Sequence, residues 1–179
     1  MNIFVLDIDP KTCARYHVDK HVVKMILELA QILSTAHRVL DGIEKVSIQN
    51  GRKLKCWELP DYRECILYKS THMNHPSTIW ARENSANYEW TLNLLDELCI
   101  EYSYRYERTH KVEFAGLLGT LQRIPDNIKL TNTRSAFALA MPDEFRTGDA
   151  VESYRAYYNG SKREMFSWKN RTTPEWISI

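Results

Sequence analysis

The sequence predicts an all-α protein: a single compact helical domain over residues 1–179, with an extended N-terminal arm and an aromatic-rich C-terminal tail. Three observations predict this class. The length of 179 residues favours one domain. Apolar residues make up 44% and charged residues 26%, as in ordinary globular proteins. Helical spacing of apolar residues recurs along the chain, whereas only residues 2–7 (NIFVLD) are typical of a short strand or an apolar arm.

The first long helix is predicted to begin at Pro10. Asp9 is a favourable N-cap residue, and proline is common in the first turn of a helix. We expect this helix to run to residues 39–40, with a break near Tyr16. Gly42 follows and favours a helix end.

The remaining elements are predicted from periodicity and turn residues. We expect a basic irregular connection over residues 43–60, a helix over 61–71 and a turn over 72–77. A long helix over 77–108, kinked near residues 84–86, should follow, then a short helix over 112–122 and a capped helix over 149–160. Pro76 marks the turn, because the residue before a proline disfavours α geometry. The tail from Trp168 onward is expected to be extended.

Composition and charge exclude several classes of protein. No segment reaches the length of a membrane span, and the N-terminus lacks the basic region of a signal peptide. The four cysteines are widely spaced, so we expect reduced thiols in the cytoplasm. The net charge of +1 gives no global electrostatic argument for nucleic acid. Two local basic clusters, residues 51–55 and 155–171, can still hold phosphates.

A narrow polar stripe follows one face of the first helix. Its members fall within an arc of about 80° at 100° per residue, and they are His17, His21, Lys24, Glu28 and Gln31. The flanking residues are aliphatic, whereas a solvated helix face normally carries charges over a wide arc. The stripe therefore predicts the floor of a cleft, although the solvated side of an amphipathic helix would also explain it.

Two kinds of chemistry fit this stripe. A carboxylate beside an amine or imidazole can move protons or stabilise a developing cation, which predicts Glu28, His21 and Lys24 as catalytic residues. The alternative is a metal-dependent hydrolase, in which zinc would bind two histidine pairs, His17 with His21 and His72 with His75. Because no H-E-x-x-H motif is present, we favour the first interpretation and expect neither a metal nor another cofactor.

Three stretches of the sequence are DKHVVKMILEL, NHPSTIWAR and SYRAYYNGSK. Together they resemble the phage pyrimidine-dimer DNA glycosylase/AP lyase family. DKHVVKMILEL is similar to the family's first helix, at Asp19, His21, Val22, Glu28 and Leu29. NHPSTIWAR resembles the opening of its central helix, which continues to an E-x3-R pattern, at His75, Pro76, Arg82, Glu101 and Arg105. SYRAYYNGSK resembles its C-terminal aromatic–basic segment that contacts substrate, at Tyr154, Arg155, Tyr157, Tyr158, Gly160 and Lys162. The matches occur in the family's order and span most of the chain.

The resemblance implies an all-α fold, a DNA substrate and Glu28 as the family's essential glutamate. It also implies an N-terminal α-amine as nucleophile, which the family exposes by removing methionine before a small residue. Asn2 is larger, so we expect Met1 to be retained and the amine to lie one residue further out. Lys24 or Lys20 is the alternative nucleophile.

One departure from the family concerns substrate recognition. At two positions where the family carries arginines for substrate phosphates and bases, this chain has Leu27 and Gln31. The resemblance therefore does not identify the base that is recognised.

We accordingly expect a DNA base-directed enzyme. The leading hypothesis is a DNA glycosylase, with or without AP lyase activity, that acts on a damaged or modified pyrimidine through Glu28. The predicted substrate-binding residues are Asn2, His17, Gln31, His75, Arg82, Tyr154, Arg155, Tyr158 and Lys162. This hypothesis requires Glu28 to lie near the chain start and near His75. The alternatives are an enzyme that modifies an unusual base, the metal-dependent hydrolase, and a non-catalytic DNA-binding protein. We expect a monomer with DNA as its partner and no membrane contact.

Overall fold

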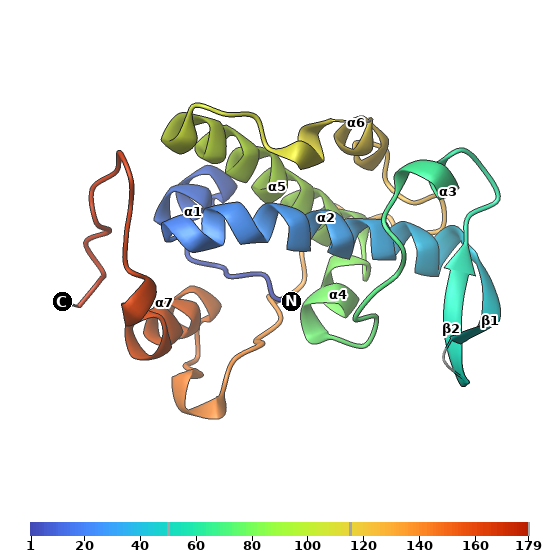
Figure 1. Ribbon diagram of the computed structural model, residues 1–179. Helices are drawn as coiled ribbons and strands as arrows, with labels where there is room; N and C mark the ends of the chain where they lie inside the picture. Colours follow the sequence, from blue (N-terminus) through green and yellow to red (C-terminus); the bar gives the residue numbers. More distant parts are fainter. Residues whose placement is uncertain (50, 115, 179) are drawn as a thin grey trace.

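Two long helices form the centre of the molecule. In a computed structural model, which describes residues 1–49, 51–114 and 116–178, helix α2 (Asp19–Asp41) packs along helix α5 (Ser85–Tyr106) (Figure 1). Their facing sides supply much of the core, including Met25, Ile26, Leu94 and Leu98. The protein is mostly helical, as predicted.

The predicted first helix is divided in two. Helix α1 (Pro10–Tyr16) begins where expected, with the Asp9 carboxylate accepting a hydrogen bond from the Thr12 amide. His17 and Val18 then adopt extended backbone conformations before α2 starts. The buried guanidinium of Arg105 donates to the carbonyl oxygens of Arg15 and His17, at 2.9 Å each. These bonds satisfy carbonyl groups that the interrupted helix leaves without partners.

The predicted long second helix is also interrupted. It consists of α4 (Pro76–Ala81) and α5, and the expected kink is a break over residues 82–84. Asn84 caps α5 by accepting a hydrogen bond from the Asn87 amide at 2.9 Å. The sequence placed the interruption within about two residues, because the cap residue itself is visible there.

A β-hairpin replaces the irregular connection that was predicted over residues 43–60. Strands β1 (Ile43–Gln49) and β2 (Arg52–Glu58) pair antiparallel, with Ile43 opposite Glu58 and Gln49 opposite Arg52. Gly51 has φ +74°, a conformation that favours glycine in a tight hairpin turn. The chain therefore forms a regular antiparallel hairpin directly after α2, where an irregular connection was expected.

The helix predicted over residues 61–71 was largely wrong. Only helix α3 (Arg63–Ile66) forms. The fully buried Arg38 explains the difference, since its guanidinium donates to the carbonyl oxygens of Leu67 at 2.9 Å and Tyr68 at 2.6 Å. Because the Arg38 side chain of α2 holds these two carbonyl groups, the segment after α3 is extended instead of helical.

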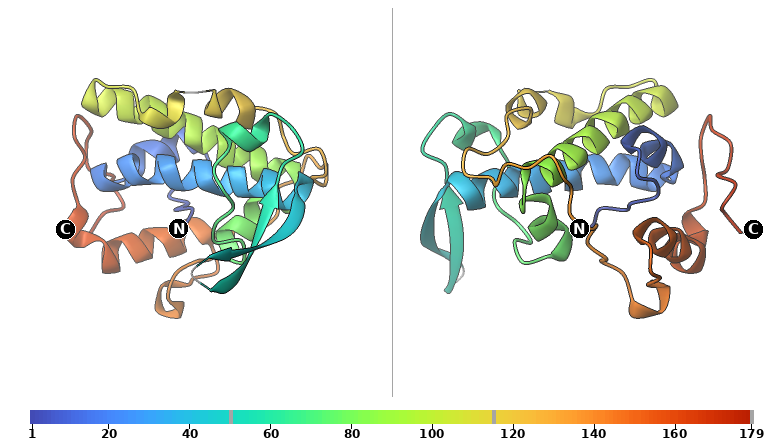
Figure 2. Two further views of the ribbon diagram at one scale, coloured as in Figure 1. Left: turned by 45° about the vertical axis from the view of Figure 1, so that its right-hand side comes forward. Right: turned by 180° about the vertical axis from the view of Figure 1, so that it is seen from behind.

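The other short elements lie on two sides of α2. The 3₁₀ helix η1 (Lys111–Glu113) and helix α6 (Leu117–Leu121) replace the single helix predicted over residues 112–122. They lie with most of α5 above α2, whereas α4, the 3₁₀ helix η2 (Asp143–Phe145) and helix α7 (Ala150–Ser161) lie below it (Figures 1 and 2). Asp149 caps α7 as predicted, by accepting from the Glu152 amide.

The two ends of the chain follow the helices closely. Residues 2–6 form neither helix nor strand and are buried. After the 3₁₀ helix η3 (Arg163–Met165), the C-terminal residues return to α1, where the Trp168 indole donates to the Tyr16 carbonyl oxygen at 3.0 Å. Among the described residues, no helix combines the length and apolar character needed to cross a membrane.

The buried Arg38 gives a test of this arrangement. Besides the carbonyls of residues 67 and 68, it bonds the Trp57 carbonyl oxygen at 2.9 Å and the Glu64 carboxylate at 2.5 Å. Arg38→Met removes this donor from the three carbonyl groups and leaves Glu64 with only Lys69 and the Leu59 amide, so we expect a loss of about 3–5 kcal/mol in the free energy of unfolding. Chemical denaturation measures it, with the exposed Arg108→Met as control. Equal stability of the two variants would contradict this role.

Candidate functional site

The buried N-terminal arm brings the start of the chain against α2. The Asn2 backbone amide donates to Oε2 of Glu28 at 3.0 Å, and the α-amine of Met1 lies 3.7 Å from the same oxygen. On the other side, Nζ of Lys24 lies 3.2 Å from Oε1. The Glu28 side chain is 12% exposed, whereas that of Lys24 is 68% exposed. One carboxylate thus faces three nitrogen atoms and remains reachable from solvent.

The Asn2 side chain fixes this geometry. Its Nδ2 donates to the Ala140 carbonyl oxygen at 2.8 Å. Its Oδ1 accepts hydrogen bonds from Ser77 Oγ of α4 at 3.1 Å and from the Tyr154 hydroxyl of α7 at 3.2 Å. Because these groups are buried, their hydrogen bonds determine where the arm can lie. Asn2 therefore links the arm to two helices that are distant in sequence.

The turn before α4 forms another wall of the site. His75 is the N-cap of α4, and its Nδ1 accepts from the Ser77 amide at 3.2 Å. Burial lowers the pKa of His75, and the positive charge of the chain's α-amine lowers it further, while Glu28 acts in the opposite direction. Ser77, whose amide bonds the His75 ring, also donates through its hydroxyl to Asn2, so His75 adjoins the residue that holds the arm. Arg82 donates to the Met73 carbonyl oxygen at 2.8 Å and holds this turn in place.

His21 lies in an aromatic cluster next to this site. Its ring stacks on Phe4 with centroids 4.5 Å apart, and its Nδ1 lies 2.5 Å from the Tyr158 hydroxyl. Burial lowers the pKa of His21 to about 3, and the charges of His17, Lys162 and Lys24 contribute. The imidazole is thus neutral at pH 7 and positions the arm through Phe4, without a direct bond to Glu28 among the described contacts.

The predicted basic residues of α7 have different surroundings. Arg155 donates to the Leu6 carbonyl oxygen at 2.9 Å and to Asp7 at 3.2 Å, so it holds the arm. Lys162 extends over the Tyr157 ring, with Nζ 4.6 Å from the centroid. Its positive charge helps to lower the pKa of His21, as the charge of Lys24 does.

The four histidines of the metal alternative do not come together. His17 is fully buried, with Nδ1 donating to the Cys13 carbonyl oxygen at 2.7 Å. Nδ1 of His72 bonds the Thr71 hydroxyl instead. Within the described part of the chain, no three His, Cys, Asp or Glu side chains are grouped in a way that could hold a metal ion.

The comparison with protein families decides the relationship. A family model described as pyrimidine dimer DNA glycosylase matches residues 1–114. The chain belongs to this family. The matched residues include the arm, Glu28, His75 and α5, whereas α7 lies outside them. No curated protein and no solved structure matches the chain. The family's activity implies DNA as the substrate.

The structure gathers some of the predicted site residues and separates others. Glu28 contacts both Asn2 and Lys24, and His75 bonds Ser77, which contacts Asn2. Gln31 is half-buried one turn further along α2. His17, Tyr154 and Tyr158 are buried in the interior around the arm. The roles assigned to these residues remain predictions.

Two members of the site were not predicted from the sequence. Ser77 and the backbone at Ala140 bind the Asn2 side chain. Ser77 directly follows His75 and Pro76, the N-cap and the first residue of α4. Its place in the first turn of this helix was the available signal in the sequence. Nothing in the sequence around Ala140 indicates that its carbonyl group meets the chain start.

Burial of the histidines makes stability depend on pH. The pKa values of His17, His21 and His37 are lowered, chiefly by burial, to about 4, 3 and 4. The unfolded chain binds protons below about pH 6.5, whereas the folded chain does not. Stability is therefore complete above pH 6.5 and is lost as pH falls toward 4.

We expect each histidine to cost about 2 kcal/mol of stability at pH 4.5 relative to pH 7. Urea unfolding at several pH values measures this loss. His21→Asn removes one of these groups, so it should make the dependence on pH shallower, whatever it does to stability at pH 7. A wild-type stability that stays constant between pH 7 and pH 4.5 would show that these histidines are not buried in their neutral form.

Proposed function

We propose that the protein is a DNA glycosylase that removes a damaged or modified pyrimidine from DNA, with Glu28 at the reaction centre. One observation carries the proposal: the Glu28 carboxylate is held against the start of the chain, 3.0 Å from the Asn2 amide and 3.7 Å from the Met1 amine. Family membership supplies the substrate class. A base in a duplex is out of reach, so the enzyme must extrude the nucleotide into the space around Glu28.

The chemistry follows from the charges at this position. As the glycosidic bond breaks, its electron pair leaves with the base and positive charge develops on the sugar. The Glu28 carboxylate stabilises that charge. The α-amine beside it, of Met1 or of Asn2 if Met1 is removed, then attacks C1′ of the sugar. This nitrogen passes a proton to Glu28, and its lone pair then forms the C1′=N double bond while the C1′–O4′ bond breaks. O4′ takes up the proton, and the product is a Schiff base.

Lys24 is the competing nucleophile, because its Nζ lies 3.2 Å from Glu28. Its side chain is 68% exposed and is not held by other groups among the described contacts. The amine at the chain start, by contrast, is positioned by the bonds of Asn2. Positioning of a reacting group contributes strongly to catalysis, so we assign the attack to the chain start and a supporting electrostatic role to Lys24.

Glu28→Gln tests the proposal. The substitution keeps the side-chain shape and can still accept the Asn2 hydrogen bond, but it removes the negative charge. We expect the rate of base release to fall at least about 100-fold. The measurement uses duplexes that carry a thymine dimer or an oxidised or modified pyrimidine, and release of the base is followed directly.

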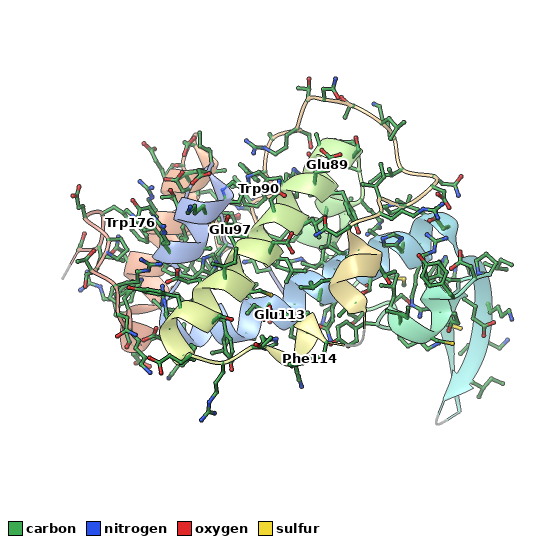
Figure 3. All side chains as sticks on the ribbon, turned by 90° about the horizontal axis from the view of Figure 1, so that it is seen from above. Glu89, Trp90, Glu97, Glu113, Phe114 and Trp176 are labelled. Atoms are coloured by element: carbon green, nitrogen blue, oxygen red, sulfur yellow. The ribbon has the colours of Figure 1, made fainter. Side chains whose placement is uncertain are left out.

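Glu89→Gln is the matched control. Glu89 is exposed on α5, which faces the viewer in Figure 3, away from the arm. This variant should keep the wild-type rate. Full activity of Glu28→Gln, with folding confirmed by circular dichroism, would contradict the proposal. Binding of DNA without base release from any substrate would favour the non-catalytic alternative.

A further inference from the structure

The hairpin of strands β1 and β2 projects from the body of the protein. Its base is fixed, because Arg38 bonds the Trp57 carbonyl oxygen at 2.9 Å and Gly42 joins β1 directly to α2. A side chain at Gly42 would collide with the Arg38 carbonyl oxygen, so glycine allows β1 to begin close against the end of α2. Figure 1 shows that the rest of the hairpin extends away from the helices.

The hairpin exposes apolar side chains that have no partner in the described chain. Ile43, Val46 and Ile48 are 60%, 60% and 72% exposed. A two-stranded hairpin is only marginally stable in water on its own. Exposed apolar residues on such a projecting element are typical of a surface that meets a partner.

The charge of the hairpin favours a polyanion as that partner. Residues 43–58 contain four cations and two anions, a net charge of +2, within a protein of net charge +1. Val46 pairs with Lys55 and Ile48 with Lys53, so both lysines share a face with exposed apolar residues. Lys55 lies 2.8 Å from Glu44, whereas Lys53 makes no ion pair among the described residues. The free positive charge therefore lies toward the tip.

The hairpin lies on the same side of the molecule as the site. In Figure 1 and both views of Figure 2 it extends below α2, where the N-terminus, α4 and α7 are also found. The distance follows from helix geometry: the thirteen residues from Glu28 to Asp41 span about 20 Å along α2. This length corresponds to about six base pairs of duplex DNA.

We propose that the hairpin is a second DNA contact, which binds duplex about six base pairs from the nucleotide at Glu28. The Lys53–Lys55 face meets the phosphates, and the apolar residues lie against the groove, since the major groove of B-DNA admits a two-stranded ribbon. This inference rests on the proposed function, because it takes DNA as the substrate. It adds that the substrate is duplex and must extend beyond the lesion on one side.

The test is DNA binding by a double variant, Lys53→Gln with Lys55→Gln. The control is Lys11→Gln with Lys111→Gln, which removes the same charge from exposed residues of α1 and η1. The probe is a duplex with an abasic-site analogue and about ten base pairs on each side. We expect the hairpin variant to raise Kd about tenfold and to lower the slope of log K against log salt by about 2. The control should match the wild type.

A shorter probe locates the contact. With only about four base pairs on each side of the analogue, the duplex no longer reaches the hairpin, so the wild type and the hairpin variant should bind equally. A photoreactive residue at position 48 should crosslink to the long duplex about six base pairs from the analogue. Because these side chains are exposed, the variants should fold normally, and thermal melting checks this.

These outcomes separate the two proposals. Weaker binding by the hairpin variant, without base release by the wild type, would support the hairpin contact and contradict the role of Glu28. Equal affinity and salt slope of the hairpin variant and wild type on the long duplex would overturn the hairpin contact and leave the role of Glu28 intact. A wild-type dimer that Ile48→Asp separates would also overturn it, because the exposed face would then bind a second copy of the chain.

Discussion

The hydrogen bonds of Asn2 are the constraint on which the site depends. A buried amide side chain must find partners, and here they come from α4, α7 and the segment at Ala140. Only one position of the arm satisfies all three. In that position the Asn2 amide and the Met1 amine meet Glu28, so the proposed reaction centre is a consequence of how the arm is buried.

Buried charges hold the helices that receive the arm. Arg105 binds Glu101 at 2.6 Å and Asp19 at 2.8 Å, and Glu101 also binds Arg171 of the tail. This cluster lies at the break between α1 and α2, where Arg105 also donates hydrogen bonds to the carbonyl oxygens of Arg15 and His17. Buried ion pairs contribute little net stability, but removal of one partner is costly, so they fix one arrangement of these elements.

Periodicity and capping made much of the fold predictable. The apolar spacing of α2 and α5, the caps at Asp9 and Asn84, and the polar stripe that contains Glu28 can all be read locally. The hairpin also had a local signal, because Asn50-Gly51 separates two seven-residue segments and is typical of a hairpin turn. The basic composition of that region favoured an irregular connection instead and obscured this signal.

The remaining features depend on contacts between distant residues. Leu67 and Tyr68 lie in a segment whose sequence predicts a helix, yet the Arg38 side chain of α2 binds their carbonyl groups. His17 lies at the break before α2, so it does not share the helical spacing of Glu28. His21 lies in α2 with Glu28, yet its ring stacks on Phe4 in the interior. Local patterns do not reveal such tertiary partners, since tertiary contacts routinely override local preference.

The identity of the attacking nitrogen tests the position of the reaction centre most directly. The protein would be mixed with abasic-site DNA and borohydride, digested, and examined by mass spectrometry to locate the reduced adduct. We predict that the adduct lies on the α-amine of the N-terminal peptide and that Glu28→Gln greatly reduces it. An adduct on Lys24 or another lysine, or undiminished trapping by Glu28→Gln, would contradict the placement of the reaction centre at the chain start.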